Sequence, residues 1–240
     1  MDTIKIRHGR TKLIAHRGLS GLERENTAAA FVAAGNRSYY GIETDVHRTA
    51  DGEFLIIHDD TTGRVTAGEN LTVEETAYAA LRQLRLPDLD GRLREDLCLP
   101  SLAEYIRICK KYEKVAILEL KNPFRREDIL KIVEIIRKEA YLEQVVFISF
   151  SLENCLCLRE MLPGQPIQWL VGREIDERVV ETLASNRLGL DALYTQLNKE
   201  LVARLHSLGI PVNCWTCNDK AHAEALVEMG VDYITTNILE

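Results

Sequence analysis

The feature that most constrains the fold is a repeated order of helix, glycine, short apolar strand and polar loop over the second half of the chain. This order, at spacings of 20 to 30 residues, is typical of parallel β/α units. No glycine-rich phosphate loop follows any strand, which argues against a nucleotide-binding sheet. We predict strands at 115–121, 145–150, 167–171, 192–195, 211–216 and 231–235, and helices at 127–139, 152–161, 176–184, 199–208 and 218–229.

The first half of the chain supplies the remaining strands. An apolar run, Leu13 to Ala15, is followed by His16-Arg17-Gly18, and an Ala-rich helix spans 28–34. Asp51-Gly52 is the favoured turn of a tight hairpin between the strand-like run that contains Glu43 and Asp45 and the apolar run 54–58. With these two residues as the turn, Asp45 should lie opposite His58. About nine strands result, and we predict a closed (β/α)8 TIM barrel with one irregular hairpin strand.

A polar, weakly periodic segment separates the hairpin from the regular part of the chain. We expect helices started by capping boxes at Thr72 and Ser101, with an irregular insertion between them at 84–99. No linker divides the chain. We therefore expect a single domain over residues 1–240 that carries this insertion.

Charge and hydropathy limit the possible partners. The net charge is −7 and there is no run of Lys or Arg, so nucleic acid is a poor candidate. No apolar stretch reaches the length of a membrane span, and the N-terminal residues lack a signal-peptide core. We expect a cytoplasmic protein that binds a small molecule. The oligomeric state cannot be derived from these residues.

Six cysteines raise the question of a zinc or redox site. Cys214 and Cys217 form a C-x-x-C, and Cys155 and Cys157 lie one residue apart. Redox pairs of this kind open a helix, whereas Cys214 lies on an apolar strand. We interpret the cysteines as small hydrophobic residues of the core in a reducing compartment.

Polar residues at the ends of barrel strands are the candidates for chemistry. Glu43, Asp45 and Glu119 offer three carboxylates without zinc-type ligands, a set that favours Mg²⁺ or Ca²⁺. Arg17 and Lys121 would stabilise the charge of a phosphate diester.

Two histidines complete the candidate site. His16 and His58 can exchange protons near neutral pH, and together with a metal and two cations they describe phosphoester cleavage. Structural alternatives exist for single members: Glu119 and Lys121 can form one ion pair, and Trp215 can be a core residue.

The chain resembles the glycerophosphodiester phosphodiesterases over nearly its whole length. The resemblance rests on an ordered set of motifs: IAHRG (14–18), RENTAAAF (24–31), GIETDV (41–46), DGEFLIIHDD (51–60), LPSLAEY (99–105), ILELK (117–121), NCWTCN (213–218) and GVDYITTN (230–237). Arg24 stands where the family often has proline, and Cys217 where it usually has an aliphatic residue; neither is a catalytic position.

The resemblance implies a (β/α)8 barrel with a small helical insertion at about 60–113. It also implies metal-dependent hydrolysis of glycerophosphodiesters to sn-glycerol 3-phosphate and an alcohol. It implies Glu43, Asp45 and Glu119 as metal ligands and His16 and His58 as the acid–base pair, in an order that stays open. Arg17 and Lys121 would contact the phosphate, with Trp215 on the glycerol side. Three alternatives remain: a lysophospholipase-D-like activity, a non-catalytic phosphate- or sugar-binding barrel, and a metal-free sugar-isomerising barrel.

Overall fold

The strands of the protein close into one barrel. The computed structural model describes residues 2–240, which contain nine strands in the order β1-β9-β8-β7-β6-β5-β4-β2-β3, and pairing of β1 with β2 closes the sheet. All neighbours are parallel except β2 and β3. The strands are β1 Lys12–Ala15, β2 Gly41–Arg48, β3 Phe54–Ile56, β4 Val115–Leu120, β5 Val145–Ser149, β6 Ile167–Val171, β7 Gly189–Leu193, β8 Val212–Trp215 and β9 Tyr233–Thr236. The predicted (β/α)8 barrel is confirmed.

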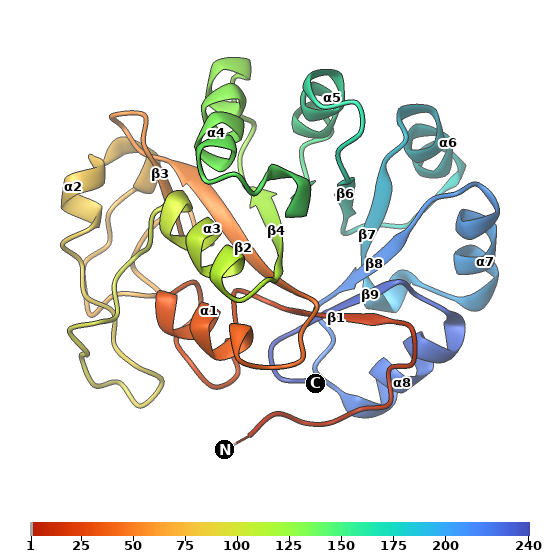
Figure 1. Ribbon diagram of the computed structural model, residues 1–240, viewed down its shortest axis with the longest axis horizontal. Coiled ribbons are helices and arrows are strands. Elements are labelled where there is room, and N and C mark those ends of the chain that lie inside the picture. Colours follow the sequence, from red (N-terminus) through yellow and green to blue (C-terminus); the bar gives the residue numbers. More distant parts are fainter. Residues whose placement is uncertain (1) are drawn as a thin grey trace.

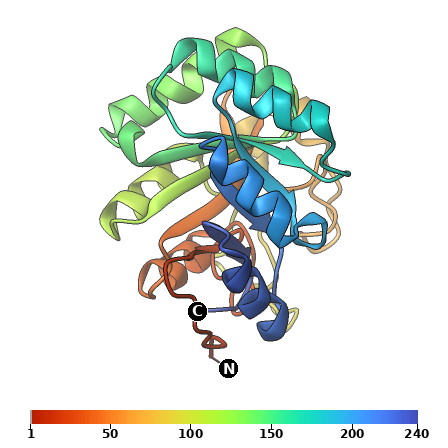
Figure 2. The ribbon, with the colours of Figure 1, turned by 90° about the vertical axis from the view of Figure 1, so that its right-hand side faces the viewer.

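Helices form a ring outside the strands (Figures 1 and 2). The helices are α1 Ala28–Gly35, α2 Tyr78–Leu81, α3 Leu102–Lys111, α4 Arg126–Lys138, α5 Leu152–Met161, α6 Glu177–Asn186, α7 Lys199–Ser207 and α8 Lys220–Met229. Side-chain caps start several of them. Ser101 and Glu104 form a complete capping box at α3, and Thr27 accepts the N–H of Ala30 at α1. The sequence therefore predicts these helix starts correctly.

The barrel interior has a small apolar core of its own. Ile14, Ile117, Val146, Ile148 and Leu170 pack together there, separate from the large core between strands and helices. A polar chain crosses the β6–β8–β9 side. In it, Gln168 Oε1 accepts from Asn213 Nδ2 at 3.0 Å, and Asn213 Oδ1 accepts from Thr235 Oγ1 at 3.3 Å. Inward-facing side chains thus fill the barrel, as this fold requires.

Strand β7 differs from its predicted position. We predicted a strand at 192–195, whereas β7 spans 189–193 and residues 194–196 form a 3-10 turn. The strand begins at Gly189, where a Cβ atom would lie 2.9 Å from Cγ of Gln168 and 3.1 Å from Cγ of Pro211. Glycine is needed for this close approach, although it is usually unfavourable inside a strand. The shift moves Asp191 into the barrel wall.

The segment between β3 and α3 lies beside the barrel and has its own apolar cluster. Leu55 and Ile57 pack there against Leu81, Leu97 and further apolar residues of the segment. In Figure 1 the segment lies next to α1 and α3. The capping box predicted at Thr72 is wrong, because Thr72 makes no side-chain cap bond and starts only a three-residue 3-10 turn at 73–75.

Glu240 lies outside the barrel, beside the connection from α1 to β2. Its carboxylate accepts hydrogen bonds from the backbone N–H and hydroxyl of Ser38 and from the hydroxyl of Thr3, and it forms an ion pair with Lys5 at 2.9 Å. Burial opposes ionisation, but the bonds from Ser38, Thr3 and Lys5 outweigh it and lower the pKa of Glu240 to about 2. We call these four residues the Glu240 cluster.

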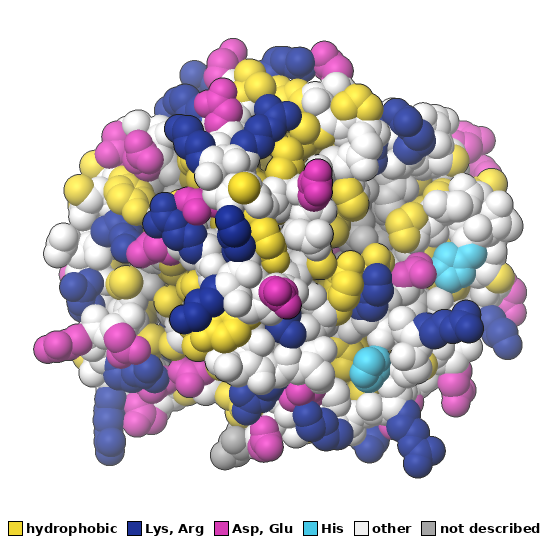
Figure 3. Space-filling view, in the orientation of Figure 1, with side chains coloured by type: hydrophobic (Ala, Val, Ile, Leu, Met, Phe, Trp, Pro, Cys, Tyr) yellow, Lys and Arg dark blue, Asp and Glu magenta, His cyan; other side chains and the backbone are white. Residues whose placement is uncertain are grey.

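The surface carries mixed charge. On the face shown in Figure 3, Lys and Arg side chains alternate with Asp and Glu over most of the visible elements. None of the helices in residues 2–240 is long and apolar enough to cross a bilayer.

Candidate active site

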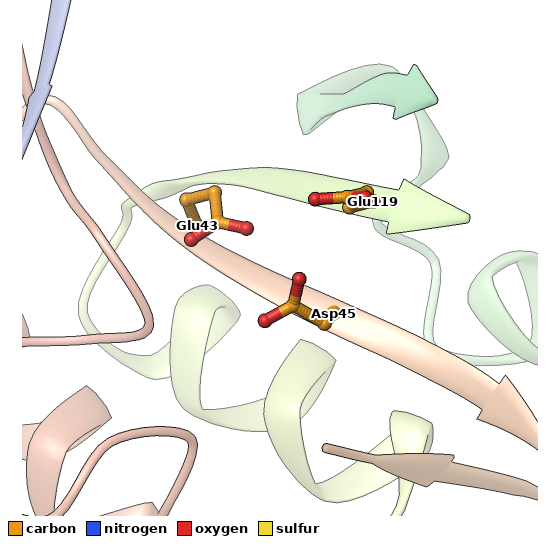
Figure 4. A group of neighbouring side chains, drawn as sticks. All are labelled: Glu43, Asp45 and Glu119. Atoms are coloured by element: carbon orange, nitrogen blue, oxygen red, sulfur yellow. The ribbon is translucent and has the colours of Figure 1, made fainter. Parts of the chain in front are cut away.

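Three buried carboxylates converge at the mouth of the barrel. Glu43 and Asp45 lie two residues apart on β2, so both face the barrel interior, and Asp45 pairs in register with Glu119 on β4. One ligand atom from each carboxylate lies within 4.8 Å of the others. Figure 4 shows the three side chains directed toward one another from the two strands. The residues predicted to bind a metal are therefore brought together.

Two cations lie against this acidic cluster. Lys121 Nζ is 2.9 Å from Glu119 Oε1 and 3.5 Å from Asp45 Oδ1. Arg17 Nε is 3.6 Å from Asp45 Oδ2, and the backbone N–H of Arg17 donates to Glu43 at 2.8 Å. Arg17 has a φ of 53°, a left-handed conformation that aims this N–H at the carboxylate.

Burial and mutual repulsion govern the ionisation of the carboxylates. Burial, then the charge of Asp45, raises the pKa of Glu43 well above its usual range and that of Glu119 to about 8. Burial would raise the pKa of Asp45 too, but Lys121 and Arg17 hold it below its ordinary value. A buried group of like charges that two monovalent cations do not neutralise fits a divalent cation, and the all-oxygen donor set fits Mg²⁺ or Ca²⁺.

His16 and His58 enter the same pocket from different strands and are held in different ways. His16 Nδ1 lies 2.7 Å from Asn237 Oδ1, so Nδ1 donates and Nε2, 4.0 Å from Glu43, keeps its lone pair. His58 Nδ1 lies 2.6 Å from a carboxylate oxygen of Asp59. Burial, with Arg17 nearby, lowers the pKa of His16 to about 4, and burial also lowers the pKa of His58.

The hairpin register predicted for His58 is wrong by one residue. Val46 pairs with Ile56, and Asp45 accepts the backbone N–H of Ile57 instead of lying opposite His58. The turn is longer than two residues, because Thr49 donates to Glu53 and Gly52 takes a φ of 80°. A three-residue turn of this kind ends in a left-handed glycine. His58 still reaches the pocket, because it follows the end of β3.

One arginine connects the two sides of the mouth. Arg64 donates to both oxygens of Asp59 at 2.6 and 3.0 Å and to both oxygens of Glu25 at 2.7 and 2.9 Å. Asp59 holds His58, and Glu25 accepts from Arg17 at 2.8 Å. Arg64 thus bridges the carboxylates that orient a histidine and a cation of the site. Such double bidentate geometry is specific to the guanidinium group.

These groups line a cavity of about 120 Å³ with two unlike sides. His16, Arg17, Glu43, His58 and Glu119 line one side, and Ile148, Phe150, Leu170 and Trp215 line the other, together with Asp191. The rings of Phe150 and Trp215 pack edge to face, with their centroids 5.5 Å apart. Trp215, which we predicted on the substrate side, therefore faces the cavity with an aromatic neighbour.

Sequence reasoning missed the residues that position the side chains of the site by hydrogen bonds. Asn26 donates to Asp45 at 2.8 Å, although the sequence shows it only as a polar residue just before the Ala-rich helix. Glu25, Arg64 and Asn237 lie in the matched motifs or next to them but gave no signal of their own, because their partners are distant in sequence. For Asp191 the sequence did hold a signal. A strand that begins at Gly189 places Gly189, Asp191 and Leu193 on one face, but we predicted the strand to begin at 192, after Asp191.

No disulfide joins the cysteines within residues 2–240. All six are free thiols; Cys109, Cys155, Cys214 and Cys217 are buried, and Cys98 and Cys157 are partly exposed. Cys214 lies on β8, as the core interpretation predicts for a strand position.

A barrel with an acidic cluster, two histidines and two cations at the carboxyl ends of its strands has the composition of a phosphodiesterase. The comparisons identify the family. Residues 16–240 match the model of the glycerophosphoryl diester phosphodiesterase family, and the chain belongs to that family of enzymes.

Relatives and solved structures agree with this assignment. A glycerophosphodiester phosphodiesterase of Caldanaerobacter subterraneus is 29% identical over 95% of this chain and 94% of its own. A phosphodiesterase of Oleispira antarctica, solved with the product sn-glycerol-3-phosphate, is 27% identical with a TM-score of 0.84 and covers 94% of this chain and 92% of its own. The Thermotoga maritima glycerophosphodiester phosphodiesterase is 25% identical with a TM-score of 0.78, covering 96% of each chain. The predicted family is confirmed.

Proposed function

We propose that this enzyme hydrolyses glycerophosphodiesters to sn-glycerol 3-phosphate and an alcohol by acid–base catalysis between His16 and His58. The observation that carries the proposal is the shared cavity, which both imidazoles line together with Arg17, Glu43 and Glu119. Asp45 and Lys121 lie against Glu119. The Oleispira antarctica relative, solved with sn-glycerol-3-phosphate, supports this substrate class.

Glu43, Asp45 and Glu119 would hold a divalent cation, Mg²⁺ or Ca²⁺. When bound, the cation supplies positive charge that polarises the phosphate. Arg17 and Lys121 would contact the non-bridging phosphate oxygens, whose negative charge grows as the phosphorus–oxygen bond breaks. Both side chains are already held in place by carboxylates, so binding the substrate orders little additional structure.

The two histidines would have different roles. His16 is partly buried and, with its pKa lowered to about 4, neutral at pH 7, so its Nε2 could remove a proton from the attacking water. His58 is hydrogen-bonded to the carboxylate of Asp59, which stabilises its protonated form, so it would donate a proton to the oxygen of the departing alcohol. As the water oxygen bonds to phosphorus and the bond from phosphorus to the alcohol oxygen breaks, one proton would pass from the water to His16 and one from His58 to the departing alcohol.

The metal requirement is tested first. Release of glycerol 3-phosphate from glycerophosphocholine and glycerophosphoethanolamine is measured in EDTA and after Mg²⁺, Mn²⁺ or Ca²⁺ is restored. We expect release only with a divalent cation, and none with His16→Ala. Equal release in EDTA would contradict the metal site, and full activity of His16→Ala would contradict the assigned base.

The assignment of His58 as the acid is tested with two leaving groups. We expect His58→Ala to lose about 10²–10⁴-fold in kcat for glycerophosphocholine but much less for a glycerol 3-phosphate ester of p-nitrophenol, which leaves without protonation. His16→Ala is the matched control and should lose equally with both. The reverse pattern would exchange the two roles.

The predicted insertion at 60–113 is the proposed determinant of the alcohol that is accepted. Its segment between β3 and α3 adjoins the mouth through Arg64, and loops on a rigid barrel commonly set specificity. Replacing residues 65–98 by those of a relative, with Arg64 kept, should change the ranking of headgroups while metal binding survives. An unchanged ranking would contradict this role.

A further inference from the structure

Asp191 is a buried acid on the side of the pocket opposite the acidic cluster. The closed order β2-β1-β9-β8-β7 places β7 across the barrel from β2. Asp191 pairs in register with Leu170 on β6 and Asn213 on β8. Paired residues share a face of the sheet, and both partners face the interior. The Asp191 side chain therefore points inward, and it lines the same cavity as Glu119 and Trp215 while only 1% exposed.

The carboxyl of Asp191 has no hydrogen-bond partner within residues 2–240, and its Oδ1 is fully buried. The polar neighbours bond to other groups: Asn213 bonds to Gln168 and Thr235, and Trp215 Nε1 donates to the backbone oxygen of Asp191 at 3.3 Å. A buried polar group left unpaired destabilises the folded state, because its hydrogen bonds to water are lost without replacement. A leucine would fill this position at lower cost, so the fold itself gives no reason for an acid here.

The chemistry of Asp191 also differs from that of the three cluster carboxylates. It is not part of the group whose ligand atoms lie within 4.8 Å of one another. Burial, and then the charge of Glu119, raises the pKa of Asp191 well above its usual range. A neutral carboxyl can both donate and accept a hydrogen bond, which matches a hydroxyl group better than a cation or a phosphate.

The neighbours of Asp191 restrict the ligand further. Phe150, Leu170 and Trp215 make this side of the cavity apolar, so the part of a ligand that lies here presents carbon to the rings. A short chain of carbons with hydroxyl groups satisfies both requirements. Its C–H groups would pack against Trp215 while a hydroxyl reaches the unpaired carboxyl of Asp191.

We propose that Asp191 is a specificity-determining residue that hydrogen-bonds a hydroxyl of the glycerol substituent of the bound diester. The proposal rests on the proposed function and adds to it the group that distinguishes glycerol from an unsubstituted alkyl chain. A site built to bond a substrate hydroxyl rejects the analogue that lacks it far more strongly than an apolar pocket distinguishes two sizes.

The test compares two diesters that differ only in hydroxyl groups, glycerophosphocholine and n-propyl phosphocholine. We expect Asp191→Leu to lower kcat/KM for glycerophosphocholine by about 10–100-fold and to change that for propyl phosphocholine less than about threefold. Asp191→Asn keeps a donor and an acceptor and should retain most of the selectivity. Asp90→Leu, in an exposed loop, is the control. Equal losses on both substrates, or no loss on either, would overturn the proposal.

A binding measurement separates this inference from the proposed reaction. Calorimetry gives the affinities of the wild-type protein and Asp191→Leu for sn-glycerol 3-phosphate and for propyl phosphate, with no turnover required. We expect the wild-type protein to prefer sn-glycerol 3-phosphate and the variant to lose that preference. Failure of hydrolysis with the preference intact would contradict only the proposed function, whereas equal affinities in the wild-type protein would overturn the role of Asp191.

Discussion

Glu43 and Glu240 are both buried glutamates, yet their surroundings displace their pKa values in opposite directions. Burial, and then the charges of Asp45 and Glu119, raise the pKa of Glu43. Glu240 is surrounded by hydrogen-bond donors and Lys5, which lower its pKa. The first arrangement destabilises an ionised carboxylate and the second stabilises it.

This difference separates a site of function from a site of stability. A group of buried like charges lowers the free energy of unfolding, so its presence needs a compensating role such as binding a cation. The Glu240 cluster satisfies its own charge and needs no ligand. Substitutions at the two places should therefore have opposite effects on activity and stability.

The largest effect is expected at the pocket. Glu43→Gln removes a proposed metal ligand and keeps an acceptor for the Arg17 N–H, so kcat should fall by at least about 10³-fold. The free energy of unfolding in EDTA should not fall, because one of three crowded charges is gone. Glycerol 3-phosphate release and urea unfolding measure the two quantities. If Glu43→Gln stayed active but unfolded at lower urea concentration, Glu43 would serve stability and not function.

Arg64 tests whether the ion pairs around the pocket serve function as well. Arg64→Gln cannot bridge Asp59 and Glu25, so His58 and Arg17 lose their fixed orientation, and we expect kcat to fall about 10–100-fold. Arg64→Lys should not restore kcat, because an ammonium group lacks the planar set of N–H donors that bonds two carboxylates at once. Arg92→Gln, in the same segment but exposed, is the control. Steady-state kinetics measures this, and an unchanged kcat in Arg64→Gln would mean that the ion pairs of Arg64 with Asp59 and Glu25 serve only stability.

The Glu240 cluster should show the opposite result. Glu240→Gln should leave activity unchanged and lower the free energy of unfolding near pH 7 by about 1–2 kcal/mol. The folded pKa of about 2 lies below the unfolded value of about 4.3, so the stabilisation is complete above the unfolded pKa. It is lost as pH falls toward 2, and the variant and the wild-type protein should then converge.

Urea unfolding at a series of pH values measures this convergence. Glu174→Gln, at an exposed position, is the matched control and should follow the wild-type protein throughout. A difference between Glu240→Gln and the wild-type protein that stays constant down to pH 2 would mean that the carboxylate charge is not the source of the stabilisation.

The smallest expected change in the free energy of unfolding is at Asp191. Asp191→Leu replaces an unpaired buried acid by an apolar side chain and should raise the free energy of unfolding by about 1 kcal/mol. The folded pKa is raised, so the wild-type protein loses stability as pH increases above the unfolded pKa of about 3.9, and the gain should grow with pH. Thermal unfolding in EDTA at two pH values checks this, and a less stable variant would contradict it.

Most of the barrel could be predicted from the sequence because each β/α unit carries its own signals. Caps such as Ser101 and apolar strands such as Val145–Ser149 act locally, and their positions are correct within about two residues. The hairpin register and β7 could not be placed, because they depend on a turn of one extra residue and on the close approach of Gly189 to Pro211.

The candidate site likewise contains residues that could be predicted from the sequence and residues that could not. The side chains at strand ends could be named because residue type and strand position both point to them, as for Glu43 and Glu119. Their partners could not, because Asn26, Arg64 and Asn237 act through residues that are far away in sequence. Asp191 also needed the three-dimensional structure, because only the pocket shows that its carboxyl is unpaired.

The closure of the barrel has a consequence for synthesis on the ribosome. Strand β1 pairs with β9, and His16 on one side of this seam is hydrogen-bonded to Asn237 on the other, 221 positions later. A nascent chain that has not yet released residue 237 cannot close the barrel or fix this histidine. Until then β1 has an unpaired edge that can recruit chaperones or a neighbouring chain, so catalytic competence is acquired after translation has passed this point.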